Sequence, residues 1–384
     1  MPKINQVSTA GVRFVSGAST AIAVFLADIA NAEARPVALS SWRQFEERAL
    51  IAGAVQDEER ATPEFEVSQA LWMSVYGWFQ NGGGKCYLAP VSGRKGLGNA
   101  LGKLEAIGEI TIVVAPDLWS GASEQEAHAS AGLIADHCAR MDNRVAILHL
   151  PKDTGASPNT DAGLGIKPDA RRQVTVYHPW VEVLDHSDPK GPRLTAPPTG
   201  HVAGVWARVD AERGVHKAPA NETLRGVVGL SHEISDTEQA ELNNLGVNAI
   251  RTFPGSGILV WGARTLAASD ATDVEHTYIN VRRSVNFIKQ SIRQSTNWVA
   301  FEQNDDRLQT SVKAMITSFL TDLWRRGMLV GKATEEAFYV ICDGTNNPPE
   351  EVQRGTLTAE VGAALVRPAE FITFEITQQA NQGD

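Results

Sequence analysis

The residues that most resemble a chemical site are Gly82-Gly83-Gly84-Lys85, because a glycine-rich loop ending in lysine can bind phosphate. The spacing does not fit: Phe79 stands where the motif needs its first glycine, and Cys86 stands where it needs Ser or Thr. A helix is predicted before the glycines and a strand after them, whereas a phosphate-binding loop leads from a strand into a helix. We therefore interpret the glycines as a turn that ends a helix. A second group, Gly96, Gly98 and Gly102, is one residue too long for a dinucleotide fingerprint.

The histidines and cysteines form no recognisable catalytic or metal motif. A serine hydrolase needs Ser, His and an acid that converge, and the sequence has no Gly-x-Ser-x-Gly elbow. His128 and His137 are nine residues apart, not four as in a helical zinc site, and His149 lies in a buried-strand pattern. We expect no catalytic site, no cofactor and no metal. A hydrolase that uses the α/β region stays an alternative, which a convergent Ser-His-Asp geometry would support.

The three cysteines, Cys86, Cys138 and Cys342, are far apart and are expected to be buried thiols. Such sparse use of cysteine is typical of a reducing compartment. No apolar run is long enough to cross a bilayer, and the start of the chain lacks the apolar core of a signal peptide.

A row of cations is the strongest candidate for a binding surface. Tyr278, Val281, Val285, Ile288 and Ile292 form an apolar helical seam, and the opposite face carries Arg282, Arg283, Lys289 and Arg293. On a chain with a net charge of -10, this face is a candidate contact for an acidic partner; the alternative is an ordinary solvated face. The net charge argues against a general nucleic-acid binder.

The elements around these residues predict an α/β domain over residues 21–268. Ile110–Ala115 and Arg144–Leu150 read as buried strands, and Ser123–Met141 between them reads as a helix with Ser123 as its N-cap. A strand, a helix and a strand of these lengths form a crossover, so the two strands are expected to be parallel. The other elements predicted are strands at Ala21–Ala27, Lys85–Pro90 and Val174–Leu184, and helices at Ser41–Ala49 and Pro63–Gln80. The Pro- and Gly-rich stretch Ala196–Leu230 is interpreted as turns, short strands and an exposed basic loop.

The remainder predicts a smaller α+β domain over residues 269–369, with extended arms at residues 1–20 and 370–384. A second amphipathic helix, Val312–Trp324, ends at Arg325-Arg326-Gly327, and strands are predicted at Ala337–Cys342 and Leu357–Val366. In Glu370–Thr377, Ile372, Phe374 and Ile376 alternate with polar residues, as in a strand with one buried face. Gly11–Val15 is a second short extended candidate.

Ordered segments across residues 70–375 resemble those of contractile tail sheath proteins. The segments, each weak alone, are Asn81–Leu88, Tyr177–Trp180, Ala196–Leu230, Asn248–Phe253, Trp261–Thr265, Tyr278–Arg283, Phe301–Asp305, Ala337–Val340 and Pro368–Phe371. Two departures stand out: Gln309 follows Leu308 where the family has Trp, and Ala10–Phe14 is a degraded form of the family's N-terminal motif. The departures leave open a non-contractile cap or a baseplate-proximal relative of the sheath.

The resemblance implies a non-enzymatic structural subunit. It implies stacked sixfold rings around an inner tube, and contraction that drives the tube through a target envelope. The α/β domain of the family is often called subtilisin-like, but this name does not imply a catalytic triad in this chain. The implied partners are further copies of the chain, the inner tube, and baseplate and terminator or cap proteins, without nucleic acid or membrane insertion. The implied location is the cytoplasm of the producing bacterium and then the particle. We expect the arms to link subunits through Val12, Phe14, Ile372, Phe374 and Ile376, and the C-terminal domain to face the tube through Arg282, Arg283, Lys289, Arg293, Arg325 and Arg326.

Overall fold

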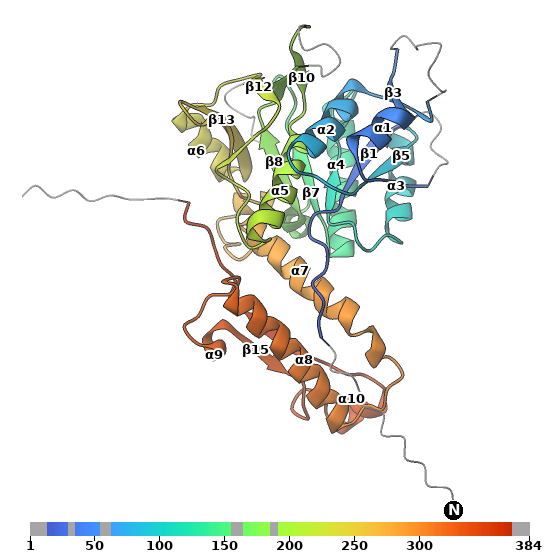
Figure 1. The fold of residues 1–384 in the computed structure, drawn as a ribbon, viewed down its shortest axis with the longest axis vertical. Helices are drawn as coiled ribbons and strands as arrows, with labels where there is room; N and C mark the ends of the chain where they lie inside the picture. The colour runs from blue at the N-terminus through green and yellow to red at the C-terminus, as the bar shows by residue number, and fades with distance from the viewer. Residues whose placement is uncertain (1–13, 30–34, 54–62, 155–163, 185–190, 371–384) are drawn as a thin grey trace, which may run out of the picture.

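The structure is a computed structural model that describes residues 14–29, 35–53, 63–154, 164–184 and 191–370. An α/β part occupies the top of Figure 1, and a smaller part built on two long helices lies below it, joined through helix α7. This arrangement confirms the predicted fold class, mixed α/β with mostly parallel strands plus a C-terminal domain.

A nine-stranded sheet forms the centre of the upper part. Its order is β11-β14-β13-β8-β7-β6-β1-β5-β2, and the strands from β13 to β5 are all parallel. Strands β14, β11 and β2 pair antiparallel at the two edges. The strands are β1 (Ala23–Asp28), β2 (Val37–Leu39), β5 (Cys86–Val91), β6 (Ile112–Val114), β7 (Val145–His149), β8 (Val174–His178), β11 (Glu222–Thr223), β13 (Val247–Phe253) and β14 (Gly257–Trp261). The predicted parallel pairing of the strands around 112 and 145 is therefore confirmed.

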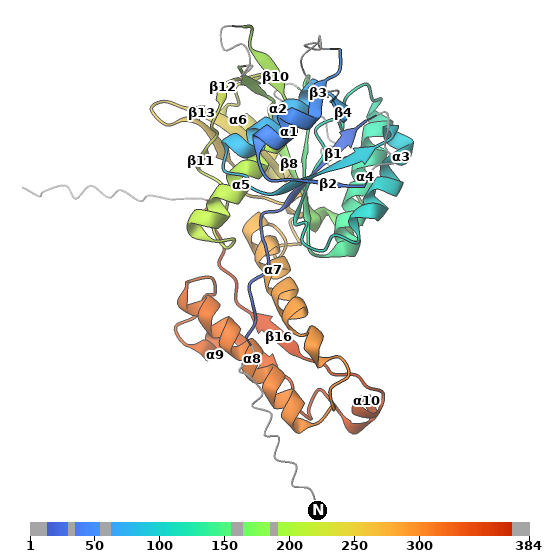
Figure 2. The ribbon, with the colours of Figure 1, turned by 45° about the vertical axis from the view of Figure 1, so that its right-hand side comes forward.

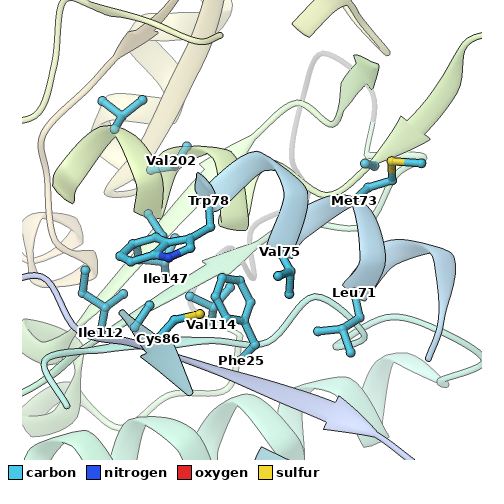
Figure 3. Packing of buried hydrophobic residues seen from close by; sticks show 14 of the residues in the cluster. Phe25, Leu71, Met73, Val75, Trp78, Cys86, Ile112, Val114, Ile147 and Val202 are labelled. Atoms are coloured by element: carbon cyan, nitrogen blue, oxygen red, sulfur yellow. The ribbon is translucent and has the colours of Figure 1, made fainter. Parts of the chain in front are cut away.

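Helices cover both faces of this sheet, because the parallel strands are apolar on both sides. Successive residues of β1 point to opposite faces of the sheet: Phe25 packs with α2 and α5, whereas Val24 packs with α3 and α4. Figure 3 shows the first core, in which Trp78 of α2 and Val202 of α5 lie over Phe25, Ile112 and Ile147 of the sheet. The helices are α1 (Trp42–Arg48), α2 (Gln69–Gln80), α3 (Gly93–Leu104), α4 (Glu124–Met141), α5 (Thr199–Arg213) and α6 (Asp236–Asn244).

Short elements complete the α/β part. They are the strand pair β3 (Ala49–Ile51) and β4 (Phe65–Val67), the three-stranded sheet of β9 (Val181–Val183), β10 (Leu194–Ala196) and β12 (Val227–Leu230), and the 3-10 turns η1 (Pro168–Gln173) and η2 (Leu266–Ser269). The prediction of one helix over Pro63–Gln80 is wrong in its first third, because Ser68 caps the helix only after β4 has ended.

The prediction for Ala196–Leu230 is wrong in its main element. Helix α5 runs through this stretch and is buried along most of its length against α2. Its glycines make that approach possible: a Cβ at Gly200 would lie 2.0 Å from the Ser74 carbonyl oxygen, and one at Gly204 would lie 2.5 Å from the Trp78 carbonyl oxygen. A helix buried on nearly all sides has no polar face, so it shows little of the periodicity by which helices are recognised in sequence.

The lower part is built on α7 (Ile279–Ser295) and α8 (Asp306–Arg325), which run side by side in Figures 1 and 2. Their apolar faces meet with a two-stranded sheet of β15 (Phe338–Ile341) and β16 (Glu360–Ala363) in a separate core. The remaining elements are η3 (Asn297–Val299), α9 (Thr334–Ala337) and α10 (Pro349–Gln353). Gly327 at φ 76° ends α8 after Arg326, as the sequence predicted.

Candidate functional site

The buried titratable groups of the α/β part are placed for packing. Burial lowers the pKa of His149 and of His201 to about 4, so both rings are neutral near pH 7. Burial also raises the pKa of Cys86 and Cys138 to about 12, and Cys342 is buried too. Within the described ranges, no group of three or more His, Cys, Asp or Glu side chains is placed to hold a metal, and no helix is long and apolar enough to span a membrane.

The polar residues that the structure does bring together form a junction between the two parts of the molecule. Its centre is Arg283 of α7, whose guanidinium pairs with both carboxylate oxygens of Asp210 in α5, at 2.5 and 2.9 Å. Both side chains are only 4% exposed. The guanidinium also stacks on Trp206, 4.6 Å from the ring centroid. A buried bidentate pair of this kind fixes the orientation of α7 on α5.

A second contact of the junction lies at the start of α7. Arg264 donates to the two carboxylate oxygens of Glu370, both at 2.7 Å, and the Tyr278 hydroxyl lies 3.1 Å from the same carboxylate. The side chain of Asn248 accepts from the Arg264 backbone N–H at 2.7 Å and donates to its carbonyl at 2.8 Å. Four of the segments that carry the family resemblance therefore meet here, although they are far apart along the chain.

The structure does not place the predicted cations on one exposed face. Arg282 and Arg283 are 6% and 4% exposed, so both lie inside the subunit, and burial lowers the pKa of Arg282. Lys289 reaches Asp142 of the α/β part and forms an ion pair with it. Arg293 is exposed. The expectation that these cations share one exposed face is wrong for the two arginines, because α7 packs against the α/β part, where Arg283 pairs with Asp210 of α5 and the charge of Asp142 acts on Arg282.

The other predicted contact residues divide between exposed and undescribed positions. Arg325 and Arg326 at the end of α8 are exposed, and Arg326 pairs with Asp322 at 2.7 Å. Phe14 is 70% exposed. Val12, Ile372, Phe374 and Ile376 lie outside the described residues. The linking and tube-contact assignments of all these residues therefore stay predictions.

The β15–β16 sheet is the feature of the lower part most suited to assembly. Within the described chain it has only these two strands, so each has one edge that pairs with no other named strand. Beside it, a groove of 560 Å³ runs between α7 and β16. Apolar side chains line much of the groove, namely Val285, Ile288, Ile292, Val361, Ala363 and Leu365, and Lys289 and Arg293 contribute positive charge.

Sequence reasoning missed Asp210, Asn248, Arg264, Tyr278 and Glu370 as parts of a site. Each of them lies in a segment that carries the family resemblance, and this was the available signal. Their pairing could not be read from the sequence, because Arg264 and Glu370 are 106 residues apart and Arg283 and Asp210 are 73 apart.

Two family models match the chain. Residues 98–266 match the phage tail sheath protein central domain, and residues 272–379 match the phage tail sheath C-terminal domain. The tail sheath protein of Burkholderia phage BcepMu is 30% identical over 209 residues, which are 53% of this chain and 42% of that protein. The tail sheath protein of Vibrio phage KVP40 is 28% identical over 191 residues, 49% of this chain and 27% of that protein. The matches thus span less than half the length of these two relatives.

Solved structures match over the whole length. A chain of the anti-feeding prophage baseplate is 30% identical, with a TM-score of 0.78 and coverage of 99% of this chain and 100% of that chain. A chain of the anti-feeding prophage helical sheath in the contracted state is 29% identical, with a TM-score of 0.77 and the same coverage. The matched family is one of structural, non-enzymatic proteins. The chain described here belongs to the contractile tail sheath protein family.

Proposed function

We propose that this chain is the structural subunit of a contractile sheath, part of a phage tail or tail-like particle. Copies of it assemble as stacked sixfold rings around an inner tube and contract to drive that tube through a target envelope. The observation that carries the proposal is the full-length similarity to a subunit of a helical sheath in its contracted state. The subunit is made in the cytoplasm of the producing bacterium, where it meets the tube, the baseplate and a terminator or cap protein.

The edges of β15 and β16 that pair with no other named strand of the described chain support assembly by strand addition; Leu329 and Val330 bridge only the residues after β16. An edge with free N–H and C=O groups accepts a strand from another chain, and side chains at alternate positions of that strand fill the adjoining groove. The alternating segment Glu370–Thr377 of a neighbouring copy has suitable chemistry. Its apolar residues Ile372, Phe374 and Ile376 match the apolar lining of the groove. Val12 and Phe14 of the other arm are proposed to make the second link.

The exposed cations at the end of α8 support a contact with the tube. Arg325 and Arg326 lie at the negative end of that helix, and both side chains are exposed. Lys289 and Arg293 are the exposed cations of α7 that remain candidates. We expect Arg325→Glu combined with Arg326→Glu to weaken recruitment to the tube while the subunit stays folded, measured by co-sedimentation with assembled tubes. Unchanged co-assembly would remove this part of the proposal.

Electron microscopy of the purified protein, alone and with its tube protein, tests the proposed function. The expected result is long ribbed cylinders around the tube. Monomers that hydrolyse ester or peptide substrates would contradict it and favour the hydrolase class.

A non-contractile cap or baseplate-proximal relative is the second candidate. The observation in its favour is the similarity to a chain solved within the anti-feeding prophage baseplate. In the same micrographs, single rings at one end of the tube, without cylinders, would support this candidate over the sheath.

A further inference from the structure

The first described residues of the chain lie along α7, and their backbone is held there by side chains at every second position. The Ser16 N–H donates to Ser295 Oγ at 3.0 Å, and the Ala18 N–H donates to Ser291 Oγ at 2.9 Å. The Thr20 carbonyl accepts from Arg283 at 3.0 Å. Figures 1 and 2 both show this segment alongside α7 before it enters β1.

The spacing of the two elements makes this contact regular. An extended chain advances about 6.6 Å in two residues, and an α-helix advances about 6 Å in four. The contacting residues of α7 are accordingly four apart: Arg283, Phe287, Ser291 and Ser295. The ring of Phe287 lies close to Gly17 of the arm. A Cβ on Gly17 would lie 3.3 Å from the Phe287 ring, so glycine leaves room for this ring. We call these four residues the α7 track.

The last described residue of the chain is held at the opposite end of the same helix. Glu370 binds Tyr278, which directly precedes α7, and Arg264 beside it. From Tyr278 to Ser295 is 17 residues, or about 25 Å of helix. The two ends of the described chain thus leave the subunit at opposite ends of one helix.

We propose that α7 positions both linking arms, setting the separation of their exit points and the direction in which each leaves the subunit. The inference rests on the proposed linking function of the arms. It adds that the track residues and Glu370 are positioning residues for that function. A force on the N-terminal arm is then transmitted to α7 as well as to strand β1. From α7, the Arg283–Asp210 ion pair transmits it to the α/β part.

The double variant Ser291→Ala and Ser295→Ala tests the track in the full-length chain. Both hydroxyls that hold the arm are lost, so we expect backbone amides of residues 14–20 to exchange hydrogen at least about tenfold faster in the isolated subunit. We also expect the sheaths formed on tubes to be less than half as long as those of the unchanged protein, by electron microscopy. Ser291→Thr with Ser295→Thr keeps the hydroxyls and should restore both readouts.

A matched control removes two hydroxyls from the neighbouring helix. Thr310 and Ser311 are exposed on α8 and donate only to carbonyls of their own helix, at 2.7 and 2.8 Å. Replacing both by Ala should change neither readout. At the other end of α7, Glu370→Ala should shorten the sheaths without changing exchange at residues 14–20.

The outcomes separate this inference from the proposed function. Unchanged exchange in the double Ala variant would overturn the track. Faster exchange with sheaths of normal length would overturn the proposal that the track positions the arm for linking. If the unchanged protein formed no sheath at all, the proposed function would fail, and the exchange measurement would still decide whether α7 holds the arm.

Discussion

At the scale of single residues, Arg283 illustrates how charge can be misread from sequence. Its position beside Arg282 on the polar face of an amphipathic helix predicted an exposed cation that could contact an acidic partner. The structure instead buries it, with Asp210 as counter-ion and Trp206 beneath it. Helical periodicity reports which residues share a face, but it does not report that a distant acidic residue is folded against that face.

We expect Asp210→Asn to destabilise the isolated subunit by about 3–5 kcal/mol, because it leaves the buried Arg283 charge without a counter-ion. Urea unfolding followed by circular dichroism measures the change. Glu47→Gln is the control: it removes an exposed partner of Arg43 and should leave the unfolding midpoint unchanged. Equal midpoints for Asp210→Asn and the unchanged protein would show that the pair does not support the fold.

Acid should destabilise the subunit through its buried histidines. His149 and His201 have a pKa of about 4 in the folded chain against 6.5 when exposed, so the unfolded chain binds more protons between these values. Their contribution to stability is therefore complete above pH 6.5 and falls as the pH drops towards 4, by at most about 3 kcal/mol for each ring.

The measurement is the free energy of unfolding at pH 7.5, 6 and 5. His201→Gln should reduce the slope of stability against pH, even if it lowers stability at every pH. A slope unaffected by this substitution would assign the acid sensitivity to other groups.

At the scale of elements, helices and strands were predicted best where the signal lies within the element itself, as an N-cap residue or a run of apolar residues. Ser123 and Glu126 form the capping box that begins α4, close to the predicted start. The buried strands β1, β6 and β7 were predicted from their apolar runs. Helix α5 was not, because its glycines and its two preceding prolines are typical of loops, and its burial comes from α2, more than a hundred residues earlier.

Glycine-mediated packing of α5 on α2 gives a sharp prediction. Gly200→Ala places a Cβ on a backbone carbonyl that cannot move aside, so we expect destabilisation on the order of 3 kcal/mol or more. Gly98→Ala in α3 is the control, since a Cβ there meets no atom within 4 Å and should stabilise the helix by about 0.5–1 kcal/mol. Thermal unfolding of both variants distinguishes packing from helix propensity, and similar shifts in both would contradict the close approach.

At the scale of the whole molecule, the family could be recognised from sequence, whereas the junction could not. The resemblance was carried by short segments in a fixed order. The structure shows that several of these segments meet around α7, where Asn248, Arg264, Tyr278 and Glu370 contact one another. Local pattern gives the segments, and only the three-dimensional fold gives their contacts.

Deleting residues 371–384 should leave a folded subunit that cannot form long sheaths, because the deletion removes the proposed linking strand and spares the cores on both faces of the large sheet and the core of the lower part. Circular dichroism measures folding, and electron microscopy measures sheath length. Deleting residues 378–384 alone is the control and should preserve assembly. Full-length sheaths from the longer deletion would refute linkage by this arm.

The burial of all three cysteines has a practical consequence for following contraction. Cys86, Cys138 and Cys342 are shielded from solvent, so thiol-reactive dyes should leave the native chain unlabelled. One cysteine introduced at an exposed site such as Val274, which is 55% exposed, would then carry a single fluorophore. Energy transfer between donor- and acceptor-labelled copies mixed in one particle would convert the movement of neighbouring subunits into an optical signal recorded in real time.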